Sequence, residues 1–322
     1  MNNLLTKPIP IHHLTLRNRI AMPPMATGKA VDGMPDDTLI THYTARAKVT
    51  GLIIVEHEYV SPEGMAHKTQ LSIAEDRVIP AYQKLTAAVR NLGAAIFAQI
   101  SHAGAQARDT GVSSLSPSGI SLSENAQEAV EMTSADIAHV IDAFAAAARR
   151  AKDAGFDGVE LHSAHGYLLN QFYSPLTNRR TDAYSGSTLE GRTRLHCEII
   201  RAVRDTVGPD YPVAIRFGAY DYKEGGSLRE EIPAACRIFE SAGIDLIDIS
   251  GGLNGTSAPG NPNPGWFSDL SRLAKDAVSI PVLVTGGVKT PQDAEDILQR
   301  GDADIIGVGR AMLQDPEWAE RI

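Results

Sequence analysis

Two histidines and a tyrosine, His162, His165 and Tyr167, follow directly on an apolar run at residues 158–161. A buried parallel strand that ends in protonatable groups is typical of an active site at the carboxyl end of a strand. Two imidazole N–H groups aimed at one oxygen can polarise a carbonyl group, and the tyrosine can deliver a proton nearby. A metal site is the weaker interpretation, because these histidines stand on a strand-to-loop turn without a cysteine partner or an obvious third ligand.

Glycines follow two later apolar runs of the chain. Gly286 and Gly287 come after residues 282–285, and Gly309 and Arg310 come after the last run. In barrels of alternating strands and helices, the loops after the seventh and eighth strands often bind a phosphate group. Glycine lets backbone N–H groups approach phosphate oxygens, and arginine adds a bidentate contact. A pair of tight turns is the structural alternative, and the presence of both loops with the arginine favours phosphate.

Three other places suit a planar, polar ligand. Pro24, Met25 and Ala26 lie in a proline-fixed loop that can hold a flat surface. The Gln99 amide has donors and an acceptor, which suits the edge of a heterocycle. Arg216 stands in an apolar strand, where a charge is almost never buried unpaired. Each has a structural alternative: a rigid loop, a glutamine that satisfies backbone groups, and an ion pair inside the barrel. For Arg216 we favour a fixed positive charge beside an anion that forms during reaction.

Short apolar runs alternate with longer amphipathic segments, and they predict the elements that must position these residues. The expected strands are residues 19–22, 52–56, 95–100, 158–161, 213–217, 246–250, 282–285 and 305–308. The expected helices are residues 39–49, 79–92, 134–154, 189–207, 229–242, 269–277 and 291–300. Eight strand–helix alternations predict an α/β fold, a single (β/α)₈ TIM barrel that forms one domain over residues 1–322.

Two segments outside this alternation complete the expected fold. Residues 9–16 precede the first strand and are expected to form an N-terminal hairpin that closes the barrel floor. Residues 101–132 form the longest irregular piece, a long loop after strand 3, and such loops are usually lids or binding loops. Glu56-His57-Glu58 ends the second strand, and the sequence gives it no firm role.

Composition excludes several classes of protein. The chain has 322 residues, of which 43% are hydrophobic, and a formal net charge of -9, which disfavours nonspecific nucleic-acid binding. Its two cysteines, Cys197 and Cys236, show no CxxC spacing, which argues against a disulfide framework, a zinc site or an iron–sulfur cluster. No apolar run is long enough to span a membrane, and the N-terminus lacks a signal-peptide pattern. We therefore expect a cytoplasmic protein with no metal and no membrane partner.

Four blocks of the sequence closely resemble one known family. Residues 18–25, 162–175, 178–187 and 307–310 are similar, in this order, to the Old Yellow Enzyme family of FMN-dependent NAD(P)H:flavin oxidoreductases, or ene-reductases. The block from 162 to 187 is long and highly specific. The first-strand loop is most similar to the barrel domain of the enoate and 2,4-dienoyl-CoA reductases. The resemblance implies tightly bound, non-covalent FMN at the carboxyl face of the barrel, and NAD(P)H as co-substrate.

The resemblance also implies roles for the residues that would hold FMN. Pro24, Met25 and Ala26 would contact the flavin through their backbone, and Gln99 would bind the pyrimidine edge of its ring. Arg216 would lie by the N1–O2 locus, where negative charge accumulates on reduction. The residues that would hold the phosphate are Gly286, Gly287, Gly309 and Arg310.

On the substrate side, the resemblance implies reduction of the C=C bond of an α,β-unsaturated carbonyl compound. His162 and His165 match the pair that binds the carbonyl oxygen of such an enone or enal. Tyr167 matches the residue that protonates the α-carbon while hydride from flavin N5 reaches the β-carbon. Ala26 departs from the family pattern, because one branch has a redox-tuning cysteine there and another a threonine. The flavin potential is therefore expected to be set differently.

Several alternatives stay open. One is FMN-dependent dehydrogenation, or other redox chemistry on a cyclic or steroid-like substrate, and another is a flavin electron carrier; a metal-dependent hydrolase is more distant. The chain ends at Ile322 without a cysteine-rich iron–sulfur segment, so we expect electrons directly from NAD(P)H or from a separate partner. Subunit arrangement is open as well, and a homo-oligomer is one alternative.

Overall fold

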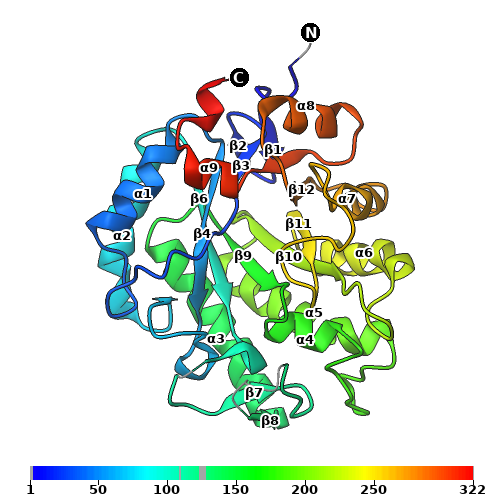
Figure 1. The fold of residues 1–322 in the computed structure, drawn as a ribbon. Coiled ribbons are helices and arrows are strands. Elements are labelled where there is room, and N and C mark those ends of the chain that lie inside the picture. Colours follow the sequence, from blue (N-terminus) through cyan, green and yellow to red (C-terminus); the bar gives the residue numbers. More distant parts are fainter. Residues whose placement is uncertain (1–2, 109, 123–127, 322) are drawn as a thin grey trace.

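Eight parallel strands close into a barrel in the computed structural model, which describes residues 3–108, 110–122 and 128–321 (Figure 1). The barrel strands are β3 (Ile20–Met22), β4 (Leu52–Tyr59), β6 (Ala95–Ser101), β9 (Gly158–Ser163), β10 (Val213–Tyr220), β11 (Leu246–Gly251), β12 (Val282–Thr285) and β13 (Ile305–Gly307). The sheet closes because β3 pairs with β13 on one side and with β4 on the other. The predicted (β/α)₈ barrel is therefore confirmed.

Helices follow the strands and cover the outside of the barrel (Figure 1). They are α1 (Asp37–Ala47), α2 (Ile79–Arg90), α3 (Ser134–Asp153), α4 (Leu168–Tyr173), α5 (Leu189–Val207), α6 (Ile232–Ala242), α7 (Ser268–Lys275), α8 (Pro291–Gln299) and α9 (Arg310–Gln314). Capping chemistry sets where they begin: Thr133 and Asp136 form a capping box before α3, and Thr290 and Asp293 form one before α8. No helix in the described part of the chain is both long and apolar enough to cross a membrane.

The barrel interior is filled from its amino end. Strands β1 (Ile9–Ile11) and β2 (Leu14–Leu16) pair antiparallel, as the sequence predicted. Ile11 and Leu16 of this hairpin pack with inward-facing residues such as Phe97, Leu246 and Leu283 in one buried cluster. This apolar plug closes the floor, so polar groups further along the same strands lie toward the opposite, carboxyl end. A separate and larger apolar cluster joins the strands to the surrounding helices.

The excursion after β6 is more ordered than the sequence predicted. Strands β7 (Ser114–Ser116) and β8 (Ala129–Glu131) pair in parallel, and they lie far from both termini in Figure 1. Three-residue strands are too short to produce a periodic pattern in the sequence, which is why the segment was expected to be irregular. Residues 109 and 123–127 of this loop lie outside the described residues. A two-residue strand, β5 (Leu71–Ser72), extends the sheet beside β4.

Arg180 fastens this excursion to the barrel. Its guanidinium donates to the carbonyl oxygens of Pro117 at 3.0 Å and Met132 at 2.7 Å, and it pairs with Asp182. Arg180 belongs to the sequence block at residues 178–187 that carried the family resemblance. The structure thus gives part of that block a role in holding the long loop in place.

Candidate active site

The structure brings His162, His165 and Tyr167 together at the carboxyl end of β9. The His162 ring lies 4.4 Å from the Tyr167 ring and 5.4 Å from the His165 ring, measured between centroids. His162 is the fifth residue of β9, and the other two lie in the loop that leads to α4. The sequence predicted this cluster because all three residues lie within one short segment.

A strained turn holds the loop in this conformation. His165 has a φ of 57°, and Gly166 follows with a φ of 76°, both in the left-handed region. The Gly166 N–H donates to Asn170 Oδ1 at 2.8 Å, and Gln171 Nε2 donates to the Gly166 carbonyl at 2.6 Å. Asn170 and Gln171 are buried on α4, so their hydrogen bonds to Gly166 fix the turn to this short helix.

The two histidines of the cluster are neutral. Burial lowers the pKa of His162 well below its usual value, and the neighbouring His165, His57 and Arg216 lower it further. Burial also lowers the pKa of His165, with Arg216 as the next cause. Neutral imidazole has one N–H donor, and an uncharged ring can hold an oxygen without protonating it. His162 Nδ1 is buried and has no hydrogen-bond partner among the described residues, while His165 Nε2 lies 2.7 Å from Ser250 Oγ.

Tyr167 remains protonated in the same environment. Burial raises the pKa of its hydroxyl to about 12. A half-buried phenol beside two neutral imidazoles is a proton donor at neutral pH, because no group of the cluster takes its proton in the resting state.

A layer of buried charge lies inside the barrel next to His162, whose register partner on β10 is Arg216. Strand register places Gln99 beside Glu160 and Arg216 beside Asp248. Gln99 Nε2 donates to Glu160 Oε1 at 2.8 Å, and Arg216 Nε lies 3.3 Å from Asp248 Oδ2. Arg216 therefore forms an ion pair inside the barrel, which was the structural alternative. It also lies at the carboxyl end of the barrel, where the functional interpretation requires a fixed positive charge.

The sequence interpretation missed the two acids of this layer. Burial and the neighbouring Asp248 raise the pKa of Glu160 to about 8, and burial raises the pKa of Asp248 to about 6. One arginine shared by two buried carboxyls favours keeping one of them protonated. An available signal was that Glu160 precedes His162 by two positions in a strand, so both side chains point to the same side of the sheet.

The loop after β3 is anchored from the neighbouring strand. Thr27 donates to the Glu56 carboxylate through its N–H and through its hydroxyl, the latter at 2.6 Å. This contact holds the segment that contains Pro24, Met25 and Ala26. A β-carbon at Gly309 would lie 2.9 Å from Met25 Sδ, so glycine allows the loops after β3 and β13 to approach each other.

The two glycine loops meet an aromatic side chain. A β-carbon at Gly286 or Gly287 would lie 2.6 Å or 2.7 Å from the Trp266 indole, so the ring packs directly on this backbone. The Arg310 guanidinium lies over the same ring, 4.9 Å from its centroid. The Arg310 side chain is exposed, and Trp266 Nε1 is buried without an acceptor among the described residues. These donors are available to an anion.

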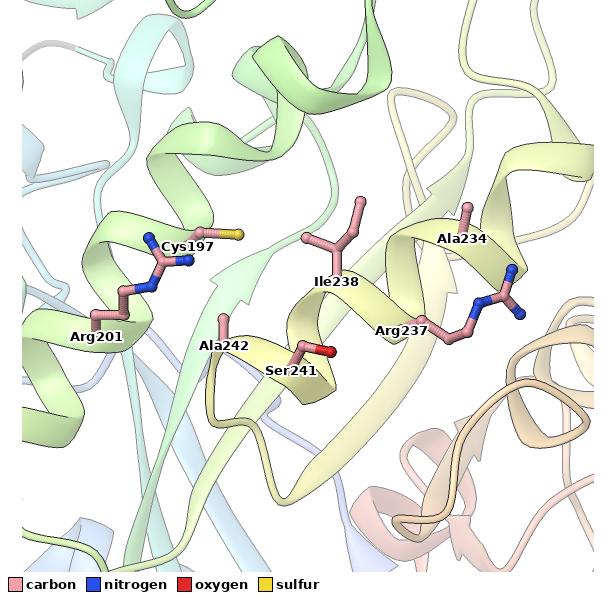
Figure 2. A pocket seen from close by; sticks show the side chains of 7 residues that line it. All are labelled: Cys197, Arg201, Ala234, Arg237, Ile238, Ser241 and Ala242. Carbon is pink, nitrogen blue, oxygen red and sulfur yellow. The ribbon is translucent and has the colours of Figure 1, made fainter.

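A groove on the outside of the barrel is a different kind of place (Figure 2). It has a volume of about 410 Å³ and lies between α5 and α6. Its lining residues are Cys197, Arg201, Ala234, Arg237, Ile238, Ser241 and Ala242. Burial raises the pKa of the Cys197 thiol, which disfavours the reactive thiolate. None of the residues predicted to do chemistry lines this groove, so the carboxyl end of the barrel remains the candidate active site.

Known proteins resemble this chain over nearly its whole length. The chain is 41% identical to an NADH oxidase of Thermoanaerobacter brockii over 97% of this chain and 49% of that protein, so it spans about half the length of that relative. It is 38% identical to an NADPH dehydrogenase of Geobacillus thermodenitrificans, over 99% of this chain and 93% of the relative.

Solved structures show the same barrel. A 2-naphthoyl-CoA reductase in complex with 2-naphthoyl-CoA superposes with a TM-score of 0.94 at 29% identity, over 100% of this chain and 52% of that chain. An Old Yellow Enzyme homologue from Zymomonas mobilis superposes with a TM-score of 0.85 at 27% identity, over 98% and 91%. The model of the NADH:flavin oxidoreductase / NADH oxidase family matches residues 4–322. The resemblance found in the sequence is thereby confirmed, and the chain belongs to this family of flavin oxidoreductases, which includes Old Yellow Enzyme.

Proposed function

We propose that this protein is an FMN-dependent ene-reductase that takes hydride from NAD(P)H and reduces the C=C bond of α,β-unsaturated carbonyl compounds. The observation that carries the proposal is the cluster of His162, His165 and Tyr167, two neutral imidazoles and a protonated phenol in ring contact. The names of the relatives, NADH oxidase and NADPH dehydrogenase, support a nicotinamide nucleotide as the hydride source.

The buried polar groups of the site fit the ring of FMN. Gln99 donates through Nε2 to Glu160, which leaves its Oε1 as an acceptor for a ring N–H. Arg216 Nε makes an ion-pair contact with Asp248 at 3.3 Å but no hydrogen bond among the described residues, and the guanidinium would supply a positive charge at the N1–O2 edge. The backbone of Pro24, Met25 and Ala26 would face the flavin ring system. Bound tightly and without a covalent link, FMN would supply the hydride chemistry that side chains lack.

The glycine loops fit the phosphate of the same cofactor. Gly286, Gly287 and Gly309 carry no side chain of their own, and the Arg310 guanidinium lies over the Trp266 ring that packs on the first two. Trp266 Nε1 is a further buried donor that lacks an acceptor. An anion in these loops would satisfy donors that the protein itself leaves open.

The histidine–tyrosine cluster fits the substrate. His162 and His165 would donate N–H hydrogen bonds to the carbonyl oxygen, which polarises the conjugated C=C bond toward hydride addition at the β-carbon. When Ser250 donates to His165 Nε2, the hydrogen of that ring lies on Nδ1 and is available to the substrate. Tyr167 would give its phenolic proton to the α-carbon.

An anaerobic spectral titration of the purified protein tests the proposal. We expect a yellow protein that is bleached by NAD(P)H and recovers its colour when cyclohexenone is added. Bleaching without recovery by any enone would retain the flavin site and reject the second half of the reaction. A colourless protein that cannot be loaded with FMN would reject the cofactor assignment itself.

A further inference from the structure

His57, which the sequence left without a role, lies against the expected proton donor. His57 Nε2 lies 3.5 Å from the Tyr167 hydroxyl, and the ring centroids are 5.3 Å apart. The His57 ring is also 6.2 Å from the His162 ring. The pairing of β4 with β6 shifts register between Val55 and Glu58, so His57 stands at a β-bulge. Bulges redirect side chains and are common beside active sites, which accounts for the presence of His57 in this cluster.

Gln70 decides which nitrogen of His57 carries the hydrogen. Gln70 Oε1 accepts the Ala66 N–H at 2.6 Å, which orients the amide with its Nε2 toward His57. Gln70 Nε2 lies 2.6 Å from His57 Nδ1, and an amide nitrogen can only donate. His57 Nδ1 is therefore the acceptor, and a neutral ring then carries its hydrogen on Nε2. This N–H is directed toward the Tyr167 oxygen.

The surroundings keep His57 uncharged. Burial lowers the pKa of His57 to about 3, and the neighbouring His67 contributes in the same direction. The His67 ring contacts His57 edge-on at 5.8 Å, and Arg108 adds positive charge near His67 and Tyr167. A neutral imidazole donates a hydrogen bond and is too weak an acid to give its proton away, so His57 is a donor to Tyr167 and not a second acid.

We infer that His57, held by Gln70, is a positioning residue for proton transfer: its Nε2–H donates to the Tyr167 oxygen and stabilises the phenolate that forms there. The inference rests on the proposed ene reduction. In that reaction the C=C bond gains hydride, supplied by NAD(P)H, at one carbon and the Tyr167 proton at the other. The Tyr167 O–H bond breaks, its electron pair stays on the phenolic oxygen, and water later returns a proton.

Burial is the reason that such a donor matters. A phenol that is partly removed from water, as Tyr167 is, resists ionisation, and a hydrogen bond to the charged form offsets that resistance. The distance of 3.5 Å between His57 Nε2 and the Tyr167 oxygen is long for a resting hydrogen bond. Catalytic hydrogen bonds often tighten when substrate binds and charge develops, so the contact is expected to shorten during the reaction.

The tautomer of His57 is a direct test that needs no turnover. We would label the histidines with ¹⁵N and identify the His57 signals by their loss in His57→Ala. The expected spectrum shows an unprotonated Nδ1 and a protonated Nε2 near pH 7. A hydrogen on Nδ1 would overturn the inference, because Nε2 would then accept a hydrogen bond from Tyr167 and hold its proton back.

A double-mutant cycle tests the coupling to Tyr167. The rate of reoxidation by cyclohexenone in a single turnover would be measured for wild type, His57→Ala, Tyr167→Phe and the double variant. Each rate would be divided by that variant's rate of reduction by NAD(P)H. His57→Ala is expected to slow the enone step about 10-fold when Tyr167 is present, as for one hydrogen bond to a charged group. No further loss is expected when Tyr167 is already Phe.

Two comparisons make the result specific. His57→Gln retains an amide donor and is expected to recover most of the rate, whereas the control His13→Ala, at an exposed histidine that pairs with Asp210, should change it less than about twofold. Equal losses from His57→Ala in both backgrounds would mean a merely structural role and would overturn the inference. If wild type reacts with NAD(P)H but with no enone, the proposed function fails and the inference fails with it. If wild type turns over and the cycle is additive, only the inference fails.

Discussion

The candidate site has two ends, the histidine–tyrosine cluster and the glycine loops after β12 and β13, and different chemical groups form them. At the histidine–tyrosine end, side chains are packed ring against ring and are neutral because of burial. At the glycine end, backbone groups and the exposed Arg310 form the surface, and Trp266 covers them. The first arrangement suits chemistry at defined atoms, and the second suits holding an anion. We therefore expect changes at the first end to alter rates and changes at the second to alter cofactor affinity.

The largest effect is expected from removal of the proton donor. Tyr167→Phe should slow reoxidation by an enone roughly 1000-fold, within the range for loss of a general acid. Reduction of the flavin by NAD(P)H should change little, since no proton from Tyr167 enters that step. Stopped-flow measurement of the two half-reactions checks this. Tyr184→Phe is the control, because it removes a hydroxyl that donates to Glu198 away from the cluster. Equal slowing of both half-reactions would contradict the assigned role.

The next largest effect concerns ligand binding at the same end. His162→Ala combined with His165→Ala should weaken binding of a substituted phenol roughly 100-fold or more, because two donors to one charged oxygen are lost. The yellow colour of bound FMN should persist. Ligand-induced spectral shifts measure the affinity, and the exposed His13 provides a control as His13→Ala. Shifts that stay unchanged in the double variant would reject the oxygen-binding assignment.

At the glycine end, a smaller effect on a different quantity is expected. Arg310→Ala should weaken FMN affinity roughly 10-fold to 100-fold, as for loss of a charge-assisted contact to phosphate. The rate of the enone step at saturating FMN should stay near that of wild type. Reconstitution of apoprotein, followed by flavin fluorescence, gives the affinity. Arg300→Ala removes an exposed arginine that pairs with Asp302 and serves as the control. If Arg310→Ala changed only the rate of the enone step and not the FMN affinity, the glycine end would not be the part that holds the cofactor.

The smallest effect concerns the layer of buried charge next to His162. The pKa of Glu160 is raised to about 8 in the folded protein from an ordinary value of 4.5, so between these values the folded state binds more protons than the unfolded state. Stability contributed by the neutral carboxyl is therefore present at low pH and lost as pH rises toward 8. Urea unfolding gives the free energy of unfolding at pH 5.5 and at pH 8. Between these two pH values, wild type should lose about 1 kcal/mol or more of that free energy relative to Glu160→Gln. If the free energy of unfolding changed with pH in the same way in both proteins, Glu160 would not be titrating between pH 5.5 and pH 8.

Much of the fold was predictable from the sequence because its signals are local. The eight strands are short apolar runs buried on both faces, and each lies within a few residues of the segment expected. Helix starts were marked by capping residues such as Thr133 and Thr290. The histidine–tyrosine cluster was predictable for the same reason, since its three members lie within six positions of each other.

The remainder of the site depends on register around a closed barrel. Gln99 meets Glu160 across 61 positions of the chain, and Thr27 meets Glu56 across 29. No pattern within either segment specifies these pairs, because strand pairing is fixed by the packing of the whole barrel. The position of Trp266 on the glycine loops beside Arg310 was likewise revealed only by the fold.

The sequence by itself determined the alternation of elements, the carboxyl-end position of the histidines and the membership of the flavin oxidoreductase family. Tertiary structure alone decided which groups share a proton or a charge. It paired Arg216 with Asp248, and through a bulge in β4 it set His57 against Tyr167. The physical reason is that burial and proximity, which fix protonation states, arise only when distant strands close around one another.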